Sequence, residues 1–185
     1  MKELSLNILD VAKNSVTANA SLIKILINET EETLEIKIID DGCGMDEETV
    51  MHVVDPFYTT RTTRSVGLGI PLFKLEAEQT GGSLTVESRS IKEDLENHGT
   101  EITALFYKNH IDFIELGDIV STVTTLISGS PEIDFLFEHK TVNGLVSLDT
   151  SQIREVLGAD VPLDSPEIIV WMTDSLKEEY ERIDF

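Results

Sequence analysis

A carboxylate and an amide lie four residues apart near the N-terminus, at Asp10 and Asn14. In a helix this spacing puts both side chains on one face, one turn apart. Asn14 offers an oxygen ligand of the kind that Mg²⁺ combines with phosphate groups, and Asp10 could orient or deprotonate an attacking water. Both residues also suit the solvated face of an amphipathic helix, so the pair alone does not decide between these interpretations.

Another carboxylate, Asp40, follows an apolar run and precedes a turn that contains Gly42 and Gly44. A carboxylate at the end of a buried strand needs hydrogen-bond donors, and an exocyclic amine such as that of adenine supplies them. Glycines at these positions would let the backbone approach a ring closely. The alternative is an ordinary acidic turn between a strand and a helix.

Gly67, Leu68 and Gly69 lie at the start of a predicted helix. Free N–H groups at the start of a helix, together with the positive end of its dipole, bind phosphate oxygens. A short glycine pattern is often only a turn, and the longer glycine-rich phosphate motifs are absent from the sequence. Taken together, the three features nevertheless indicate a nucleotide site.

The elements that would hold these residues follow from apolar periodicity and from turn residues. In order, they are a helix (4–18), two strands (21–27, 34–39), a helix (47–54), a long mobile loop (55–66), a helix (68–79) and two strands (83–88, 101–107). Asn7 falls on the polar face of the first helix, and Leu72, Leu75 and Ala77 fall on the inward face of the third. We expect the charged residues 90–98 to form an exposed loop.

A segment of different character follows residue 108. Residues 109–185 contain 16 acidic and four basic residues. The patterns predict a helix (119–127), a hairpin (133–137, 145–148) and two more helices (151–157, 166–183). We expect Phe135, Phe137 and Trp171 in the core. The sequence therefore divides into residues 1–108 and a small acidic α+β module over 109–185, for which docking of a protein partner is a hypothesis.

Composition excludes several classes of function. Lys and Arg total 14 against 35 Asp and Glu, a net charge of -21 over 185 residues. Such a surface repels phosphate backbones and anionic lipid, so we expect no nucleic acid and no membrane among the partners. No signal-peptide pattern and no apolar run of ~18 residues occurs, so we expect a cytoplasmic protein. The lone Cys43 cannot form an internal disulfide. The four histidines are scattered and show no ligand spacing for structural zinc, and we expect all of them on the surface or in loops: His52, His98, His110 and His139.

The order and spacing of these motifs resemble the GHKL superfamily of ATP-binding domains, which includes histidine-kinase catalytic domains, gyrase, the heat-shock 90 chaperones and MutL. Residues 8–15 resemble its N-box, residues 40–44 its DxGxG box and residues 67–70 its GxG phosphate box. Residues 99–100 resemble a fourth box, and residues 55–61 resemble the PFxTTK lid of bacterial sensor kinases. The resemblance covers residues 3–108. It implies an α/β (α+β) two-layer sandwich with helices on one face of a mixed β-sheet, as the element order also suggests.

The resemblance implies ATP and Mg²⁺ as cofactors. Asn14 would ligate Mg²⁺, Asp40 would bind the adenine amine and Thr100 would support Asp40. Including the lid and the phosphate box, the implied binding residues are Asn14, Asp40, Gly42, Gly44, Thr60, Arg61, Gly67, Leu68, Gly69 and Thr100. Arg61 stands where the lid of the relatives usually has lysine.

For function, the resemblance implies a stand-alone protein kinase or regulatory switch that acts on a separate protein, with the lid at residues 53–66 coupling nucleotide state to the partner. No helix pair with a phosphoacceptor histidine precedes the N-box, so we do not expect a self-contained sensor kinase. A weak ATPase is an alternative, in which Asp10 replaces the usual glutamate. A non-catalytic, nucleotide-gated binding module is another, and a homodimer is left open.

Overall fold

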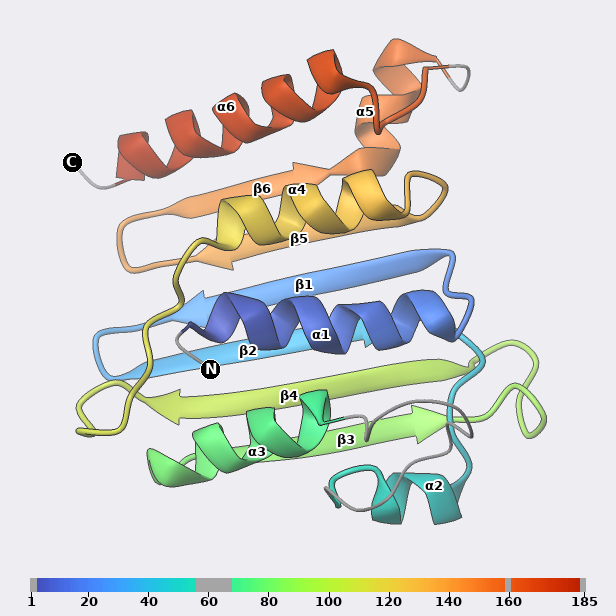
Figure 1. The fold of residues 1–185 in the computed structure, drawn as a ribbon, viewed down its shortest axis with the longest axis vertical. Helices are drawn as coiled ribbons and strands as arrows, with labels where there is room; N and C mark the ends of the chain where they lie inside the picture. Colours follow the sequence, from blue (N-terminus) through green and yellow to red (C-terminus); the bar gives the residue numbers. More distant parts are fainter. Residues whose placement is uncertain (1–2, 56–67, 159–160, 184–185) are drawn as a thin grey trace.

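Six strands form one mixed sheet in the order β3-β4-β2-β1-β5-β6 (Figure 1). The computed structural model describes residues 3–55, 68–158 and 161–183. Every neighbouring pair of strands is antiparallel except β1 and β5, which run parallel. The strands are β1 (Leu22–Glu29), β2 (Thr33–Asp40), β3 (Ser83–Arg89), β4 (Gly99–Tyr107), β5 (Asp134–Lys140) and β6 (Leu145–Asp149).

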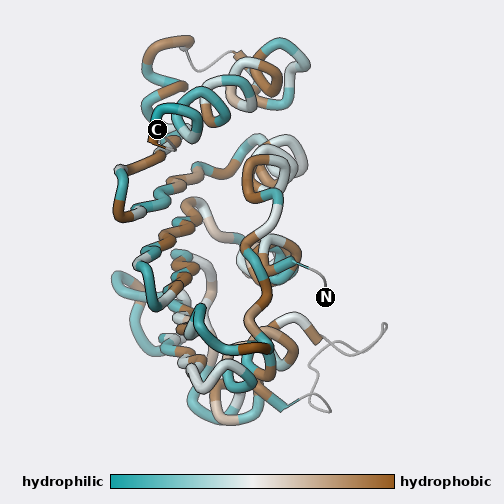
Figure 2. Tube along the Cα trace, turned by 90° about the vertical axis from the view of Figure 1, so that its left-hand side faces the viewer, coloured by the Kyte–Doolittle hydropathy of each residue, from teal (hydrophilic) through white to brown (hydrophobic). Residues whose placement is uncertain are grey.

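Helices α1, α3 and α4 lie side by side against one face of this sheet (Figures 1 and 2). α1 packs between α3 and α4, while α6 contacts α4 and the edge strand β6. The helices are α1 (Leu4–Thr17), α2 (Glu47–His52), α3 (Gly69–Gln79), α4 (Ile119–Gly129), α5 (Thr150–Leu157) and α6 (Pro166–Ile183). The expected fold class, helices on one face of a mixed sheet, is confirmed.

The core lies between the sheet and these helices. Alternate residues of the central strands point toward α1, so Ile25 and Ile38 are buried while their chain neighbours are only partly covered. The rings of Phe73 of α3 and Phe106 of β4 pack against each other at a tilt, with centroids 5.6 Å apart. Phe137 extends the same layer onto β5. This packing fixes α1, and therefore Asn14, over the middle of the sheet.

Strands β5 and β6 come from the acidic C-terminal segment, yet they continue the sheet. β5 pairs with β1 from Leu22 opposite Asp134 to Asn28 opposite Lys140. The expected hairpin and helices of this segment are present, with the bounds of α6 as expected and the others within a few residues. The division of the chain at residue 108 stays a prediction, but residues 119–149 share the sheet and the helix layer of the first segment.

Two apolar side chains expected inside are on the surface. Leu75 is 50% exposed because α3 buries Ile70, Phe73 and Ala77, which leaves Leu75 on the opposite side of the helix. Trp171 is 52% exposed because α6 turns its neighbour Met172 inward. The predictions for these two residues were wrong, whereas burial of Phe135 and Phe137 is confirmed.

Two polar side chains expected on the surface are inside. Asn7 is fully buried because α1 is flanked by α3, and its Nδ2 donates to Glu76 Oε2 at 2.7 Å. His139 is 3% exposed because it occupies the inward-facing position after Phe137 on β5. In the part of the chain that the structure describes, no helix is long and apolar enough to cross a membrane.

Candidate nucleotide site

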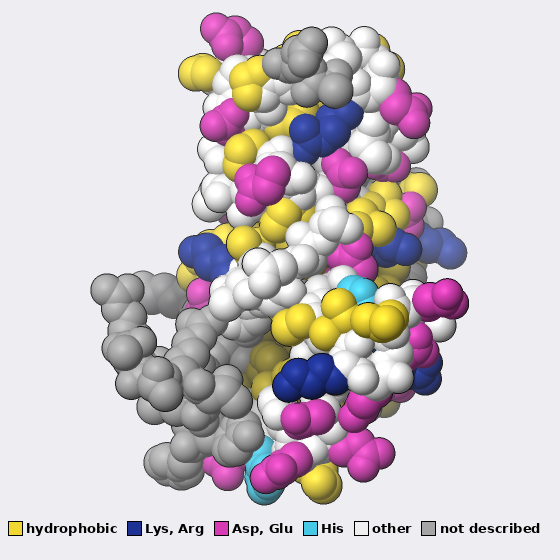
Figure 3. Space-filling view, turned by 90° about the vertical axis from the view of Figure 1, so that its right-hand side faces the viewer, with side chains coloured by type: hydrophobic (Ala, Val, Ile, Leu, Met, Phe, Trp, Pro, Cys, Tyr) yellow, Lys and Arg dark blue, Asp and Glu magenta, His cyan; other side chains and the backbone are white. Residues whose placement is uncertain are grey.

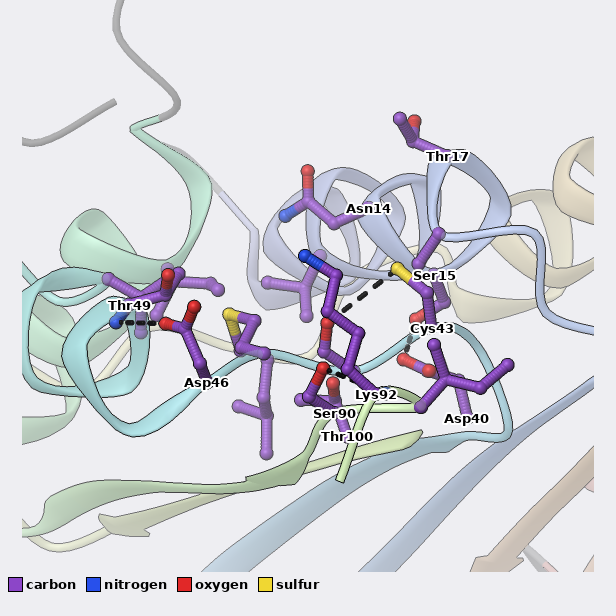
Figure 4. A pocket seen from close by; sticks show the side chains of 18 residues that line it. Asn14, Ser15, Thr17, Asp40, Cys43, Asp46, Thr49, Ser90, Lys92 and Thr100 are labelled. Atoms are coloured by element: carbon purple, nitrogen blue, oxygen red, sulfur yellow. Dashed lines mark hydrogen bonds between the residues drawn. The ribbon is translucent and has the colours of Figure 1, made fainter. Parts of the chain in front are cut away.

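A cavity of about 450 Å³ opens between α1 and the chain that follows β2 (Figure 4). α1 contributes Asn14 and Ser15, and the end of β2 contributes Asp40. Residues 43–46 and α2 form a second side, and residues 90–92, between β3 and β4, form a third. The cavity therefore joins segments that are far apart in the sequence.

Asp40, at the end of β2, is one of the carboxylates that line this cavity. Ser15 Oγ donates to its Oδ2 at 2.6 Å, and the backbone N–H of Gly42 donates to its Oδ1 at 2.9 Å. A carboxylate oxygen accepts two hydrogen bonds, so each oxygen of Asp40 keeps acceptor capacity. The two donors hold the carboxylate in one orientation in which it can receive further N–H groups.

The neighbouring Asp41 has a different role. Its Oδ1 accepts the backbone N–H groups of Ser21 at 2.7 Å and Leu22 at 2.9 Å, and the Ser21 hydroxyl donates to Oδ2. Partial burial raises the pKa of Asp41, but these hydrogen bonds outweigh it and the pKa lies below its usual value. Asp41 thus anchors the turn to the start of β1, and Asp40 alone of this pair lines the cavity.

Gly42 and Gly44 are required by contacts within the protein. A Cβ on Gly42 would lie 2.8 Å from the Ala18 Cβ, and one on Gly44 would lie 1.9 Å from the Arg89 carbonyl oxygen. Gly44 also has φ of 63°, a conformation that favours glycine. We expected these glycines to let the backbone approach a ring. The contacts show a second reason, close packing of the turn against α1 and the end of β3.

Asn14 lines the cavity, whereas Asp10 lies one turn earlier on α1, is exposed and is not part of the lining. Asp10 instead faces the start of α3, where a Cβ on Gly69 would lie 3.4 Å from the Asp10 Cβ. Leu68 precedes α3 as its N-cap residue. Three predicted site residues, Thr60, Arg61 and Gly67, lie outside the described residues, as does most of the predicted lid.

Thr100 lies beside Asp40 in the sheet and lines the cavity. Its hydroxyl lies 2.9 Å from Ser88 Oγ, which donates to the Gly99 carbonyl at 2.8 Å. The hydroxyl that contacts Asp40 belongs to Ser15, a residue that the sequence arguments did not single out. Its position one residue after Asn14, on the same helix, was the available signal.

Residues 90–98 were predicted to be an exposed loop, but part of this segment lines the cavity. The lining includes Ser90, Ile91 and Lys92. Ile91 donates its backbone N–H to the Cys43 carbonyl at 2.9 Å, and Ser90 is buried. No periodicity in this charged segment signals such a role, because its position depends on the turn at residues 42–45.

The fold and the cavity define a class of protein, an α+β sandwich with a cavity between its N-terminal helix and the turn after β2. Residues 1–110 of this chain match the family described as Histidine kinase-, DNA gyrase B-, and HSP90-like ATPase. The match extends over more than half of the 185 residues, and the chain belongs to this family.

Similar sequences are found among bacterial sensor kinases. The chain is 34% identical over 90 residues to the sensor histidine kinase YvrG of Bacillus subtilis, a match that covers 46% of this chain and 14% of YvrG. It is 33% identical over 85 residues to the sensor histidine kinase CitA of Klebsiella pneumoniae, covering 44% of this chain and 16% of CitA. The matched segment therefore spans less than a fifth of the length of these relatives.

Solved structures with a similar fold match a larger share of the chain than these sequence relatives do. The Aquifex aeolicus MutL ATPase domain complexed with ADP is similar with a TM-score of 0.55 at 15% identity, over 85% of this chain and 69% of that one. The N-terminal domain of a DNA repair protein has a TM-score of 0.55 at 18% identity, over 86% and 58% of the two chains. These likenesses concern the fold, and with 85–86% of the chain covered they extend beyond residues 1–110.

Proposed function

We propose that this chain binds ATP with Mg²⁺ in the cavity beside α1 and acts as a protein kinase or regulatory switch on a separate protein. The observation that carries the proposal is the Asp40 carboxylate, which is held by Ser15 and the Gly42 N–H yet keeps acceptor capacity inside a cavity of about 450 Å³. An adenine amine is a donor that suits such a carboxylate, and a volume of this size suits a small-molecule ligand.

The remaining contacts follow from the position of α1 relative to α3. Asn14 lines the cavity, and its amide oxygen is a hard ligand of the type that Mg²⁺ accepts alongside phosphates and water. Leu68 and Gly69 at the start of α3 would present backbone N–H groups to the phosphates. By family resemblance Gly67, Thr60 and Arg61 would complete this end of the site. Mg²⁺ would neutralise part of the phosphate charge.

The kinase assignment rests on the similarity to sensor histidine kinases. A protein bearing a phosphoacceptor side chain would then be the partner. An ATPase is a second candidate, favoured by the position of Asp10 against Gly69 at the start of α3. In that reaction Asp10 would orient a water for attack on the terminal phosphate.

Calorimetric titration tests the nucleotide site. Asp40→Asn replaces one acceptor oxygen with a donor and should weaken ATP binding by a few kcal/mol, or at least tenfold in Kd. Asp174→Asn, at an exposed position on α6, removes the same charge and should leave the Kd unchanged. If Asp40→Asn bound ATP as tightly as the unaltered chain, the proposed adenine position would be wrong.

Phosphate release and phosphotransfer distinguish the two reactions. With γ-labelled ATP, a kinase should release little phosphate alone but should label a supplied domain with a phosphoacceptor histidine. An ATPase should release phosphate by itself, and Asp10→Asn should abolish release while ATP binding persists. Binding with neither release nor transfer would favour a nucleotide-gated binding module.

A further inference from the structure

Residues 90–98 pack on the turn that carries Asp40. At one end, Ile91 donates its backbone N–H to the Cys43 carbonyl at 2.9 Å. At the other, His98 Nδ1 lies 2.6 Å from the Gly42 carbonyl, so Nδ1 carries the proton because a carbonyl only accepts. Both contacts are made with carbonyl groups of adjacent residues in the turn. The segment is therefore positioned by the same turn that lines the cavity.

The segment also has a defined internal structure. Asp94 accepts the backbone N–H groups of Glu96 and Asn97, each at 3.0 Å, and Arg89 Nη1 at 3.1 Å. The bonds from Glu96 and Asn97 lower the pKa of Asp94 to about 2. Such a turn restricts the conformations of the chain on either side of it. Residues 90–92 are thus held from both directions, by the Cys43 carbonyl and by the Asp94 turn.

Lys92 is the basic residue that this segment brings to the cavity. Its backbone N–H donates to Ser90 Oγ at 3.3 Å, and its side chain extends along the cavity toward Asn14 (Figure 4). Among the described lining residues the other charged groups are the carboxylates Asp40 and Asp46. Hydrogen bonds from Thr49 lower the pKa of Asp46, and the charge of Lys92 lowers it further.

The charge of the whole chain makes a local cation important for an anionic ligand. The net charge is -21, and at this end of the molecule acidic side chains are widespread while Lys and Arg are isolated (Figure 3). That field opposes the approach of a polyphosphate. A lysine ammonium at the cavity wall offsets it locally and can donate charge-assisted hydrogen bonds to phosphate oxygens.

We propose that residues 90–92 form a wall of the nucleotide site and that Lys92 Nζ binds the phosphate groups of the nucleotide. This inference rests on the proposed function and deepens it. Under this proposal Lys92 contributes to ligand specificity, because a contact to phosphate favours ATP and ADP over adenosine. Asp40 would bind the adenine base, which ATP, ADP and adenosine share.

The test compares the Kd values of ATP, ADP and adenosine for the full chain and for two variants. Lys92→Gln should weaken ATP and ADP by about tenfold and leave adenosine unchanged. Lys140→Gln, at an exposed position on β5, makes the same change in net charge and should alter none of the three Kd values. Lys92→Arg keeps the cation and should retain most of the ATP affinity.

Ionic strength supplies a second readout. Salt screens both the local attraction of Lys92 and the repulsion from the acidic surface, so the difference in ATP Kd between Lys92→Gln and the unaltered chain should shrink as ionic strength rises, while Lys140→Gln should match the unaltered chain throughout. The inference is overturned if Lys92→Gln and Lys140→Gln bind ATP equally, or if Lys92→Gln loses adenosine as much as ATP. If the unaltered chain bound none of the three ligands, the proposed ATP-binding function itself would be wrong, and this result is distinct from the two that overturn the role of Lys92 alone. Thermal unfolding checks that each variant is folded.

Discussion

The hydroxyl of Ser15 lies 2.6 Å from Asp40 Oδ2 and joins α1 to the end of β2. The two residues are 25 positions apart in the chain, and both line the cavity. The same helix that carries Asn14 therefore also orients the carboxylate proposed to bind adenine. The affinity of a ligand that contacts both Asn14 and Asp40 would therefore change with any shift of α1 relative to the sheet.

Ser15→Ala tests this relationship. Without the hydroxyl, Asp40 loses one of two donors that hold it, so we expect ATP affinity to fall roughly threefold to tenfold and stability by about 1 kcal/mol. Calorimetry and denaturant unfolding measure the two effects. Ser175→Ala, on α6 away from the cavity, is the control. Unchanged affinity in Ser15→Ala would show that Asp40 does not depend on this bond.

Gly44→Ala should be strongly destabilising. A Cβ there would lie 1.9 Å from the Arg89 carbonyl oxygen, and φ is 63°. The left-handed conformation alone costs about 1 kcal/mol for alanine, and the clash adds to it, so we expect a loss above about 2 kcal/mol. Gly129→Ala, at the end of α4 with nothing within 4 Å of its Cβ, should be neutral or slightly stabilising. Equal melting temperatures for the two variants would contradict this account.

Asn7 stabilises a buried carboxylate between two helices. Its Nδ2 donates to Glu76 Oε2 at 2.7 Å, and both side chains are buried. Asn7→Ala removes this donor, so we expect a loss of about 1–3 kcal/mol in the free energy of unfolding. Asn109→Ala, at an exposed turn position, should change it by less than about 0.5 kcal/mol. A double-mutant cycle with Glu76→Gln should show coupling, and additive losses would refute the contact.

His139 should make stability depend on pH. Its Nε2 lies 3.1 Å from Glu29 Oε2 and its Nδ1 lies 2.8 Å from the Tyr180 hydroxyl, which ties α6 to β5 and β1. Burial lowers the pKa of His139 below 6.5, although Glu29 opposes the shift. The unfolded chain therefore binds the proton more readily. Stability from this group is complete above about pH 6.5 and declines as the pH falls toward the folded pKa.

Urea unfolding between pH 7.5 and about 5 measures this effect. The unaltered chain and His52→Gln, which changes an exposed histidine on α2, should both lose stability on acidification. His139→Gln should lose less over the same range, because the proton-linked group is gone. Parallel pH profiles for His139→Gln and His52→Gln would mean that His139 does not contribute.

Local patterns predicted the elements of this fold well, because helical and strand periodicities depend on neighbouring residues. The bounds of α6 were predicted to the residue, and those of α1 to within one. The same periodicity was wrong for Asn7, since it identifies one buried face of an element. α1 is flanked by α3 as well as covering the sheet, so a second part of its surface is buried. The expectation for His139 was wrong because the predicted strand ended at residue 137, whereas β5 continues to Lys140.

The sequence by itself determined the family, the ordered motifs and the placement of Asn14 and Asp40 on elements next to one cavity. These features depend on short segments whose residue types restrict the local backbone. Tertiary structure decided which groups meet there, above all Ser15 with Asp40 and residues 90–92 beside the turn at Cys43. It also decided that β5 extends the sheet from β1. Such contacts join distant segments through sheet register and packing, which no local pattern encodes.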